Sequence, residues 1–336
     1  METLFVCNKR EKYIANLQKH LSKENKKVKI LQINGFKLYE NEKDYKEIPP
    51  RGFSALLNKI PKLKVLSKIA HIKNILSKNE YENIVFFYND WTIKYLLPSL
   101  LKSSKKLFFH IDSPSQFKGL KEAFKKANAL IFSDPQTKEE FEKIYKREFL
   151  EKSFICRKGV EFKPVKTVKN EEKKGIYCDI LAVKNIKEFV NSLDKNSFYI
   201  FPMLKESFER RKELKEILKE SGLNYKISNS FLTEEENLSL IANSEFIIAL
   251  TDPKYSQTIQ HALYLKKICI IYENFTKFFD EKEFHFVTIK KLKELGKIRE
   301  RIGEYEKYKN ENAKNVYALF SFENIVKTCE KILEKR

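Results

Sequence analysis

Short apolar runs alternate along the chain with stretches in which apolar residues recur every three or four positions. A short apolar run is typical of a buried strand, and the longer recurrence is typical of an amphipathic helix. In the first half, this pattern predicts strands at Leu4–Cys7, Val28–Gln32, Ile84–Tyr88, Lys106–His110, Ala129–Ser133 and Ser153–Cys156. It predicts intervening helices at Lys9–Leu21, Trp91–Leu101, Lys118–Lys126 and Thr137–Tyr145. Because parallel neighbours in a sheet need long crossovers, the alternation predicts a parallel sheet covered by helices.

The alternation stops at Phe162–Lys174, which is polar, rich in lysine and without periodicity, and then starts again. A last amphipathic helix is predicted at Phe320–Leu333, with Ser321 as its N-cap. The two series predict an α/β protein with two Rossmann-like domains facing each other across a cleft. We expect the domains at 1–160 and 175–318, the linker at 161–174 and the terminal helix at 319–336. The second series places strands at Gly175–Cys178, Phe198–Phe201, Asn224–Ile227, Phe246–Leu250, Ile268–Ile271 and His285–Ile289, and helices at Lys184–Leu193, Glu209–Ser221, Glu234–Ala242 and Thr258–Leu265.

We interpret the composition as that of a globular protein kept in the cytoplasm. Apolar residues fill 42% of the 336 positions, and 8 glycines and 9 prolines are too few for a turn-rich all-β architecture. The chain shows neither the basic and apolar regions of a signal peptide nor a run of about 18 apolar residues that would span a membrane. The five cysteines form no C-x-x-C pair, which argues against a zinc site or a disulfide framework. We expect four of them to be core residues.

The formal net charge of +20 indicates an anionic partner, such as lipid headgroups, nucleic acid or a phosphorylated substrate. The alternative is that an AT-rich genome places lysines at solvated positions. The charge is strongest in Arg51–Lys78, which holds seven cations and no acidic residue. Apolar residues recur at helical spacing on both sides of Pro61, and this predicts two basic amphipathic helices.

Basic amphipathic helices can lie on an anionic leaflet or dock an acceptor, which makes this segment a candidate for the inner face of the membrane. The alternative is that the apolar stripe packs on the core while the lysines are solvated. Nucleic acid is a weaker hypothesis, since the segment lacks interleaved aromatic residues and clustered arginines. The residues proposed for docking are Arg51, Lys59, Lys62, Lys64, Lys68 and Lys73.

Polar residues follow two of the predicted strands. His110 ends one strand and Asp112 comes shortly after it, at the kind of strand end where α/β sheets place their ligands. A satisfied core histidine is the alternative for His110. Asn89 and Asp90 follow the preceding strand, where capping the next helix is their expected role. Neither G-x-G-x-x-G nor G-x-x-x-x-G-K-[ST] occurs, which argues against a dinucleotide or P-loop site.

In the order of its elements and in several local sequence segments, nearly the whole chain resembles the GT-B glycosyltransferases, particularly the retaining family-4 type. The terminal Phe-Ser-Phe-Glu helix is similar to the family's last helix, which crosses back onto the N-domain. The segments that carry the resemblance are Ala127–Tyr145 (ANALIFSDPQTKEEFEKIY, the unit closing the N-domain), Phe154–Glu161 (FICRKGVE, a strand ending in Asn-Gly-Val-Asp with Lys158 in place of Asn), Leu232–Leu250 (LTEEENLSLIANSEFIIAL, bordering the base) and Tyr255–Ile271 (YSQTIQHALYLKKICII, holding ribose and phosphates).

The resemblance implies a donor side in the second domain. Lys184 opens a helix where the family has a lysine, and it would offer one cation to the donor phosphates. Ser256, Gln257 and Thr258 follow Tyr255 at the start of another helix, whose amides would face phosphate, and ordinary N-capping is the alternative for the hydroxyls. His261 stands where the family has a ribose-binding glutamate.

The resemblance also implies a catalytic pair and shows departures from the family. His110 and Asp112 match a His-Asp pair that faces acceptor and donor. Neither of the family's two glutamates is present, because His261 replaces one and the other falls near Pro253 or Asp252. The family's phosphate-binding Gly-Arg reads Asp179-Ile180, so that arginine is missing.

We therefore expect a glycosyltransferase that moves a sugar from a nucleotide sugar, a UDP-sugar by our hypothesis, to a glycan, lipid-linked or protein acceptor. No D-x-D motif stands where a metal-dependent transferase needs it, so metal-independent catalysis is expected, without a resident cofactor. Two alternatives stay open. The missing glutamates and arginine favour a non-catalytic GT-B-like subunit or binding module, and the charge favours a DNA-modifying glycosyltransferase.

Overall fold

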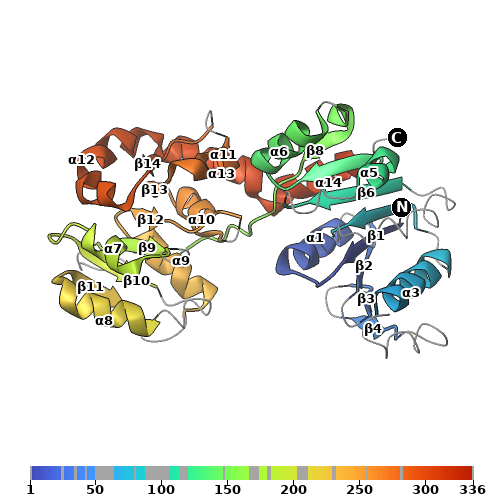
Figure 1. Cartoon of the computed structure of the whole chain (residues 1–336), viewed down its shortest axis with the longest axis horizontal. Coiled ribbons are helices and arrows are strands. Elements are labelled where there is room, and N and C mark those ends of the chain that lie inside the picture. Colours follow the sequence, from blue (N-terminus) through green and yellow to red (C-terminus); the bar gives the residue numbers. More distant parts are fainter. Residues whose placement is uncertain are drawn as a thin grey trace. The chain divides into compact units, whose positions relative to one another are not determined.

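The computed structural model (Figure 1) divides the chain into two compact units. The first comprises Met1–Gly159 and Phe322–Arg336, and the second comprises Val160–Ser321. The structure describes residues 2–23, 26–33, 36–41, 44–49, 64–78, 81–87, 106–113, 120–146, 148–165, 174–179, 183–202, 211–228, 232–254, 256–280 and 283–334.

The first unit contains a sheet in the order β4-β3-β2-β1-β5-β6-β7-β8. From β2 to β8 all neighbours are parallel, and β3 and β4 add an antiparallel extension. The six strands predicted for the first half are confirmed, whereas β3 and β4 were missed because each is three residues long and mostly polar. The elements are β1 (Glu2–Cys7), α1 (Lys12–Lys23), β2 (Lys27–Gln32), β3 (Lys37–Tyr39), β4 (Tyr45–Glu47), α3 (Lys64–Lys78), β5 (Asn83–Phe86), β6 (Lys106–Ile111), α5 (Lys121–Lys126), β7 (Ala129–Phe132), α6 (Pro135–Tyr145), η3 (Leu150–Lys152), β8 (Ser153–Ile155) and α14 (Phe322–Glu334). The helix predicted at Trp91–Leu101 lies outside the described residues.

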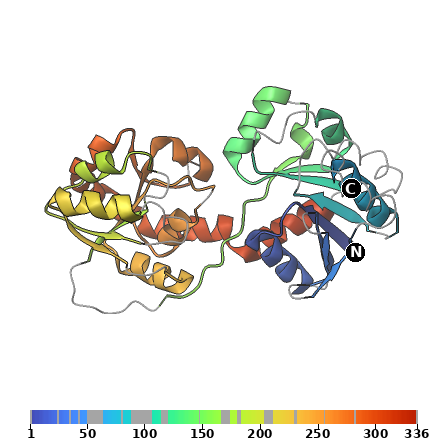
Figure 2. The same ribbon diagram turned by 60° about the horizontal axis from the view of Figure 1, so that its bottom comes forward.

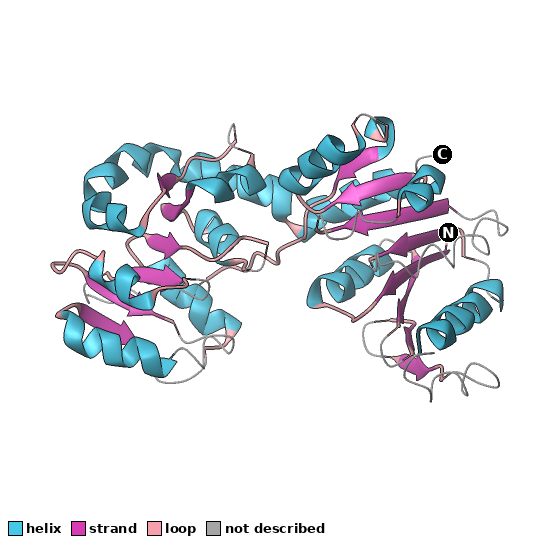
Figure 3. Ribbon diagram, in the orientation of Figure 1, coloured by secondary structure: helices cyan, strands magenta, loops and turns pink. Residues whose placement is uncertain are grey.

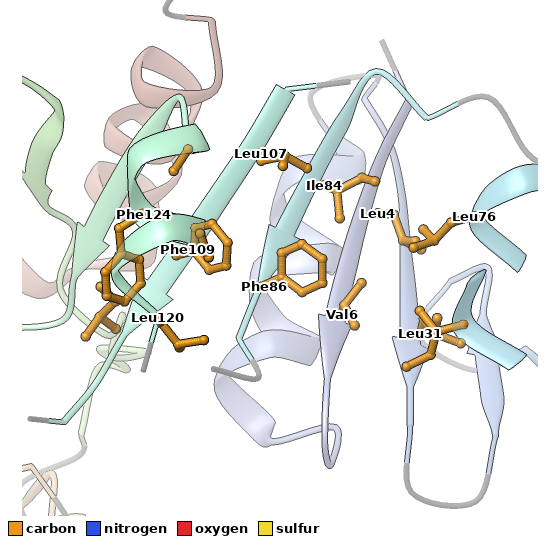
Figure 4. Packing of buried hydrophobic residues seen from close by; sticks show 14 of the residues in the cluster. Leu4, Val6, Leu31, Leu76, Ile84, Phe86, Leu107, Phe109, Leu120 and Phe124 are labelled. Carbon is orange, nitrogen blue, oxygen red and sulfur yellow. The ribbon is translucent and has the colours of Figure 1, made fainter. Parts of the chain in front are cut away.

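Helices cover both faces of this sheet. Along β1, Leu4 and Val6 point to one face, where α3 and α5 complete the core (Figure 4). Phe5 and Cys7 point to the opposite face, where α1 and α14 lie. The alternation along a strand that is buried on both sides explains why the sequence shows continuous apolar runs here.

The C-terminal helix α14 belongs to the first unit and packs beside α1, as Figure 2 also shows. Ile325, Val326 and Cys329 place its apolar stripe in the core of the second face. The prediction that Ser321 caps this helix through its hydroxyl is wrong. Ser321 does stand directly before α14, but its hydroxyl is buried and has no hydrogen-bond partner among the described residues, while its backbone pairs with Val160 in an isolated parallel bridge.

The second unit has a fully parallel sheet in the order β11-β10-β9-β12-β13-β14, flanked by helices (Figure 3). All six strands predicted for this half are present. The elements are β9 (Ile176–Asp179), α7 (Ile186–Asn191), β10 (Phe198–Phe201), α8 (Arg211–Ser221), β11 (Asn224–Ile227), α9 (Glu234–Asn243), β12 (Ile247–Ala249), α10 (Thr258–Tyr264), β13 (Cys269–Tyr272), η5 (Glu273–Phe275), α11 (Thr276–Phe279), β14 (Val287–Ile289), η6 (Leu292–Lys297), α12 (Ile298–Ile302), η7 (Gly303–Tyr308) and α13 (Lys309–Phe320). Both units are therefore Rossmann-like, and the α/β fold class is confirmed.

Local sequence signals explain several helix boundaries. Asp134 caps α6 by accepting the Thr137 amide at 2.7 Å, and Pro135 follows at the first helical position, where its missing N–H is not needed. In α9, Thr233 and Glu236 form a reciprocal capping box. These caps fix where each helix leaves its strand, and so fix the loops at the strand ends.

The basic segment is described only in its second half, as α3. Ile69, Ile72, Ile75 and Leu76 are buried in the first core, so these apolar positions are used for packing rather than being free for a bilayer. This corrects the membrane-surface interpretation for the α3 stripe, and it agrees with the alternative that the stripe packs on the core. Lys73 is half-buried, while Arg51, Lys59, Lys62 and the side chains of Lys64 and Lys68 lie outside the described residues, so docking by the lysines stays a prediction.

All five cysteines are buried and reduced, one more than the four expected in the core. Burial raises the pKa of Cys7 to about 12, so this thiol stays protonated at neutral pH. No helix in the described ranges is both long enough and apolar enough to cross a bilayer.

Two glycines give a matched test of packing. A Cβ on Gly159 would lie 2.7 Å from the Phe322 ring, whereas a Cβ on Gly303 would meet nothing within 4 Å at a helical φ of −54°. Gly159→Ala is expected to lower the free energy of unfolding by about 1–3 kcal/mol through overpacking. Gly303→Ala is expected to raise it by about 0.4–1 kcal/mol. Urea unfolding of each full-length variant checks this, and equal effects of the two substitutions would contradict it.

Candidate functional site

In the first unit, polar residues gather where the parallel strands end. β6 ends with His110 and Ile111, and Asp112 follows directly, while Lys158 comes three residues after β8. In open α/β sheets this carboxyl edge is where ligands bind. The sheet therefore brings together residues that are far apart in the sequence.

Asp112 joins the other two residues of this group. His110 Nδ1 lies 3.1 Å from Asp112 Oδ1, and Lys158 Nζ lies 3.3 Å from Asp112 Oδ2. The His110 side chain is 3% exposed, whereas Asp112 and Lys158 retain 30% and 34%, so the chain of charges runs from a buried imidazole to solvent. The predicted pairing of His110 with Asp112 at this edge is present in the geometry, and its catalytic role stays a prediction.

The charges around Asp112 control its ionisation. Burial favours the protonated form, but the charge of His110 and then that of Lys158 outweigh this and hold the pKa of the Asp112 carboxyl well below its ordinary value. The carboxylate is therefore ionised throughout the neutral range. In the neutral form of the ring, a carboxylate at Nδ1 favours the tautomer with hydrogen on Nδ1, which leaves the lone pair on Nε2.

Aromatic side chains hold the imidazole of His110. The Phe87 ring centroid lies 4.7 Å from that of His110, and the Tyr13 ring lies 5.8 Å away. Tyr13 also stacks on Phe322 of α14. Burial, more than the nearby ionisable groups, raises the pKa of Tyr13 well above its usual value, and its hydroxyl has no hydrogen-bond partner in the described part of the chain. The two rings of Phe87 and Tyr13 restrict the rotation of the His110 ring.

In the second unit, Asp179 lies at the point where the strand order reverses, between β9 and β12. Its side chain is 1% exposed. Thr251 donates to Asp179 Oδ1 at 2.7 Å, and Ser256 donates to Asp179 Oδ2 at 3.2 Å. The Ser256 hydroxyl also lies 2.9 Å from that of Thr258 and accepts the Thr258 amide at 3.2 Å. The network therefore links the hydroxyls of Thr251, Ser256 and Thr258 to Asp179 at the switch point, the place at the carboxyl edge where the strand order reverses.

The five predicted donor-side residues fall into different environments. The hydroxyls of Ser256 and Thr258 are engaged by the Asp179 network. The N-cap of α10 is the exposed Gln257, which makes no side-chain capping bond, so neither hydroxyl caps this helix. His261 is 7% exposed and its ring lies 6.0 Å from Phe162. Lys184 is exposed just before α7, and Tyr255 lies outside the described residues, as do Asn89 and Asp90.

Sequence reasoning missed three contributors to these sites. Lys158 was seen only as a departure from a family motif, and Asp179 only as a lost glycine, while Thr251 was not considered. All three lie at or just after the carboxyl end of a strand, and this position is the signal that could have found them. Among the described residues, no three His, Cys, Asp or Glu side chains gather to hold a metal ion.

Solved structures match the fold over nearly its whole length. A sucrose-phosphate synthase from Thermosynechococcus elongatus matches with a TM-score of 0.66 at 13% identity, covering 98% of both chains. Anabaena HepE in complex with UDP-glucose matches with a TM-score of 0.65 at 13% identity over 100% of both. The UDP-GlcNAc 2-epimerase from Neisseria meningitidis, bound to UDP-GlcNAc, matches with a TM-score of 0.59 at 13% identity, again over 100% of both chains.

These likenesses establish the architecture. No protein-family model matches the sequence, and no curated protein matches it. The chain has the GT-B fold, with two parallel-sheet Rossmann-like domains, and its structural neighbours include glycosyltransferases and epimerases of that fold.

Asp112→Asn tests the ion pairs that Asp112 makes with His110 and Lys158. The amide keeps the shape but loses the charge that His110 and Lys158 face, so the free energy of unfolding at pH 7 is expected to fall by about 2 kcal/mol. The folded-state pKa of Asp112 is depressed, so its contribution is fully present above the unfolded pKa of about 4 and is lost as the pH falls towards the folded pKa. Urea unfolding between pH 7 and pH 3 should show a constant gap to wild type that narrows below about pH 4. A gap unchanged down to pH 3 would contradict the assignment.

Proposed function

We propose that the chain is a glycosyltransferase that takes a sugar from a UDP-sugar and transfers it to a hydroxyl of a glycan, lipid-linked or protein acceptor. The GT-B fold supports a nucleotide-sugar substrate, since HepE and the epimerase bind UDP-glucose and UDP-GlcNAc in this fold. The observation that carries the proposal is the group of His110, Asp112 and Lys158 at the carboxyl edge of the first sheet.

This group has the chemistry to activate an acceptor hydroxyl. Asp112 stays ionised, favours hydrogen on Nδ1 of His110 and so directs Nε2 to act as a base. In the proposed reaction, the bond between the anomeric carbon and the phosphate oxygen breaks, and the acceptor oxygen bonds to that carbon. The acceptor proton passes to His110, and the nucleoside diphosphate leaves. Lys158 adds a positive charge beside the carboxylate, where it orients Asp112.

On the donor side we propose that Lys184 contacts the diphosphate and that Ser256, Gln257, Thr258 and His261 border the ribose and phosphates. Lys184 is exposed and follows the first strand of the second sheet, next to the switch point where such folds bind ligands. A lysine binds phosphate as a point charge and needs no fixed geometry. What supports the proposal for the donor side is that these residues follow the carboxyl ends of strands in the second sheet.

A non-catalytic binding module is the second candidate, and one observation favours it. Asp179 is buried at the switch point and takes up the hydroxyls of Thr251 and Ser256, so a carboxylate stands where a diphosphate would need positive groups. A module of this kind would keep the fold and bind no nucleotide.

The first test is nucleotide binding by the full chain. UDP at millimolar concentration is expected to raise the Tm, with GDP, ADP and CMP as the comparison panel. Lys184→Gln should weaken UDP binding about 10-fold, since one charge-assisted contact to phosphate is lost. Lys187→Gln, which removes an exposed lysine from the same helix region, is the control and should bind as wild type does. No stabilisation by any of the four nucleotides would favour the module.

The second test is turnover. Incubation with UDP-glucose or UDP-GlcNAc and a glycan acceptor is expected to release UDP, and His110→Ala should slow the release by about 10²–10⁴-fold, the usual contribution of a general base. His20→Ala, which removes a half-buried ring of α1 that stacks on Phe322 and not on His110, should leave the rate within about two-fold of wild type. If the sugar nucleotide is converted to an epimer without UDP release, the chain is an epimerase. Equal rates for both histidine variants would remove His110 from the mechanism.

A further inference from the structure

A cavity of about 560 Å³ lies in the second unit beside β14, the edge strand of the sheet. Its walls come from the segment after β13, from Phe284–Phe286, from Thr288 and from Tyr305. None of the lining residues belongs to the network of Asp179, Thr251, Ser256 and Thr258, which joins β9, the end of β12 and the start of α10. Its volume is within the range of small-molecule sites, about 300–1,000 Å³.

The cavity has an apolar floor and polar walls. Phe284 and Phe286 are 3% and 5% exposed and pack against the Phe279 ring, which makes the floor rigid. The His285 ring is fixed by stacking on Tyr308 at 3.8 Å.

Four polar side chains of the walls have no hydrogen-bond partner within the described ranges. They are the amide of Asn274, the ammonium of Lys277 and the hydroxyls of Thr288 and Tyr305. Together they offer several donors and acceptors to a ligand that carries hydroxyl groups.

The charges on the walls leave one positive group uncompensated. Glu273 lies 3.4 Å from Lys290, so its charge is already balanced, and His285 Nε2 lies 3.8 Å from Glu311. Lys277 has no such partner among the described residues. A ligand that matches this cavity therefore carries a negative group next to its hydroxyls.

We propose that this cavity binds a small anionic sugar, a polyhydroxylated ring that bears one carboxylate or phosphate. Lys277 binds the acidic group, Asn274, Thr288 and Tyr305 bind ring hydroxyls, and the floor of Phe284 and Phe286 receives the C–H face. The site is lined partly by residues that follow the carboxyl end of β13, but it shares no residue with the donor side proposed above, so its test is separate from that of the proposed function.

Isothermal titration of the full-length protein tests this with four probes: glucuronate, glucose 6-phosphate, glucose and inorganic phosphate. At least one of the two anionic sugars is expected to bind, and the affinities for glucose and inorganic phosphate should be at least 10-fold weaker. Comparing glucuronate with glucose 6-phosphate shows whether the site prefers a carboxylate or a phosphate. Lys277→Gln should weaken binding about 10-fold and Thr288→Val about 3-fold. Lys293→Gln, at an exposed lysine away from the cavity, should leave the affinity unchanged. Saturating UDP should not displace the anionic sugar.

Several results would overturn the proposal. These are the absence of binding by both anionic sugars, equal binding of inorganic phosphate and glucose 6-phosphate, displacement by UDP, and an affinity of Lys277→Gln equal to that of wild type. Circular dichroism of each variant confirms that a loss of binding does not come from unfolding. Because UDP binding is measured separately, a failure here leaves the proposed function untouched.

Discussion

In each unit the central strands are covered by helices on both faces, so residues along them have no access to water. A charged side chain in the middle of such a strand would lose its hydration without compensation, and this favours the strand ends for charged groups. β1 shows the rule, since Leu4, Phe5, Val6 and Cys7 are all at most 1% exposed on alternating faces. The chemistry of the protein is therefore concentrated at the edges of its sheets.

At the strand ends of the first unit, buried polar groups contact one another. His110 is nearly as buried as the core, and Asp112 stands beside its polar ring. His110 and then Lys158 keep the pKa of Asp112 low, so its carboxyl stays ionised. Each of these three residues offsets part of the desolvation cost of its neighbour. Removing one of them would leave a buried polar group without its partner. Tyr13 and Phe87 keep water from most of the imidazole.

The second unit handles the same edge differently. Asp179 is buried and accepts hydrogen bonds from the hydroxyl groups of Thr251 and Ser256. A carboxylate at this position disfavours a second negative charge close by, because like charges in a poorly hydrated site repel strongly. A donor diphosphate would therefore have to depend on groups farther along the edge, such as Lys184.

The sequence by itself determined the architecture, because apolar runs and helical periodicity depend only on neighbouring residues and on the burial that each element needs. It also marked His110 and Asp112, which are close together in the chain. It did not reveal the short polar strands β3 and β4, whose pairing depends on β2 rather than on their own composition. Only the tertiary structure decided that Lys158 meets Asp112 and that Ser256 turns to Asp179, because these contacts join strand ends far apart in sequence and depend on strand order.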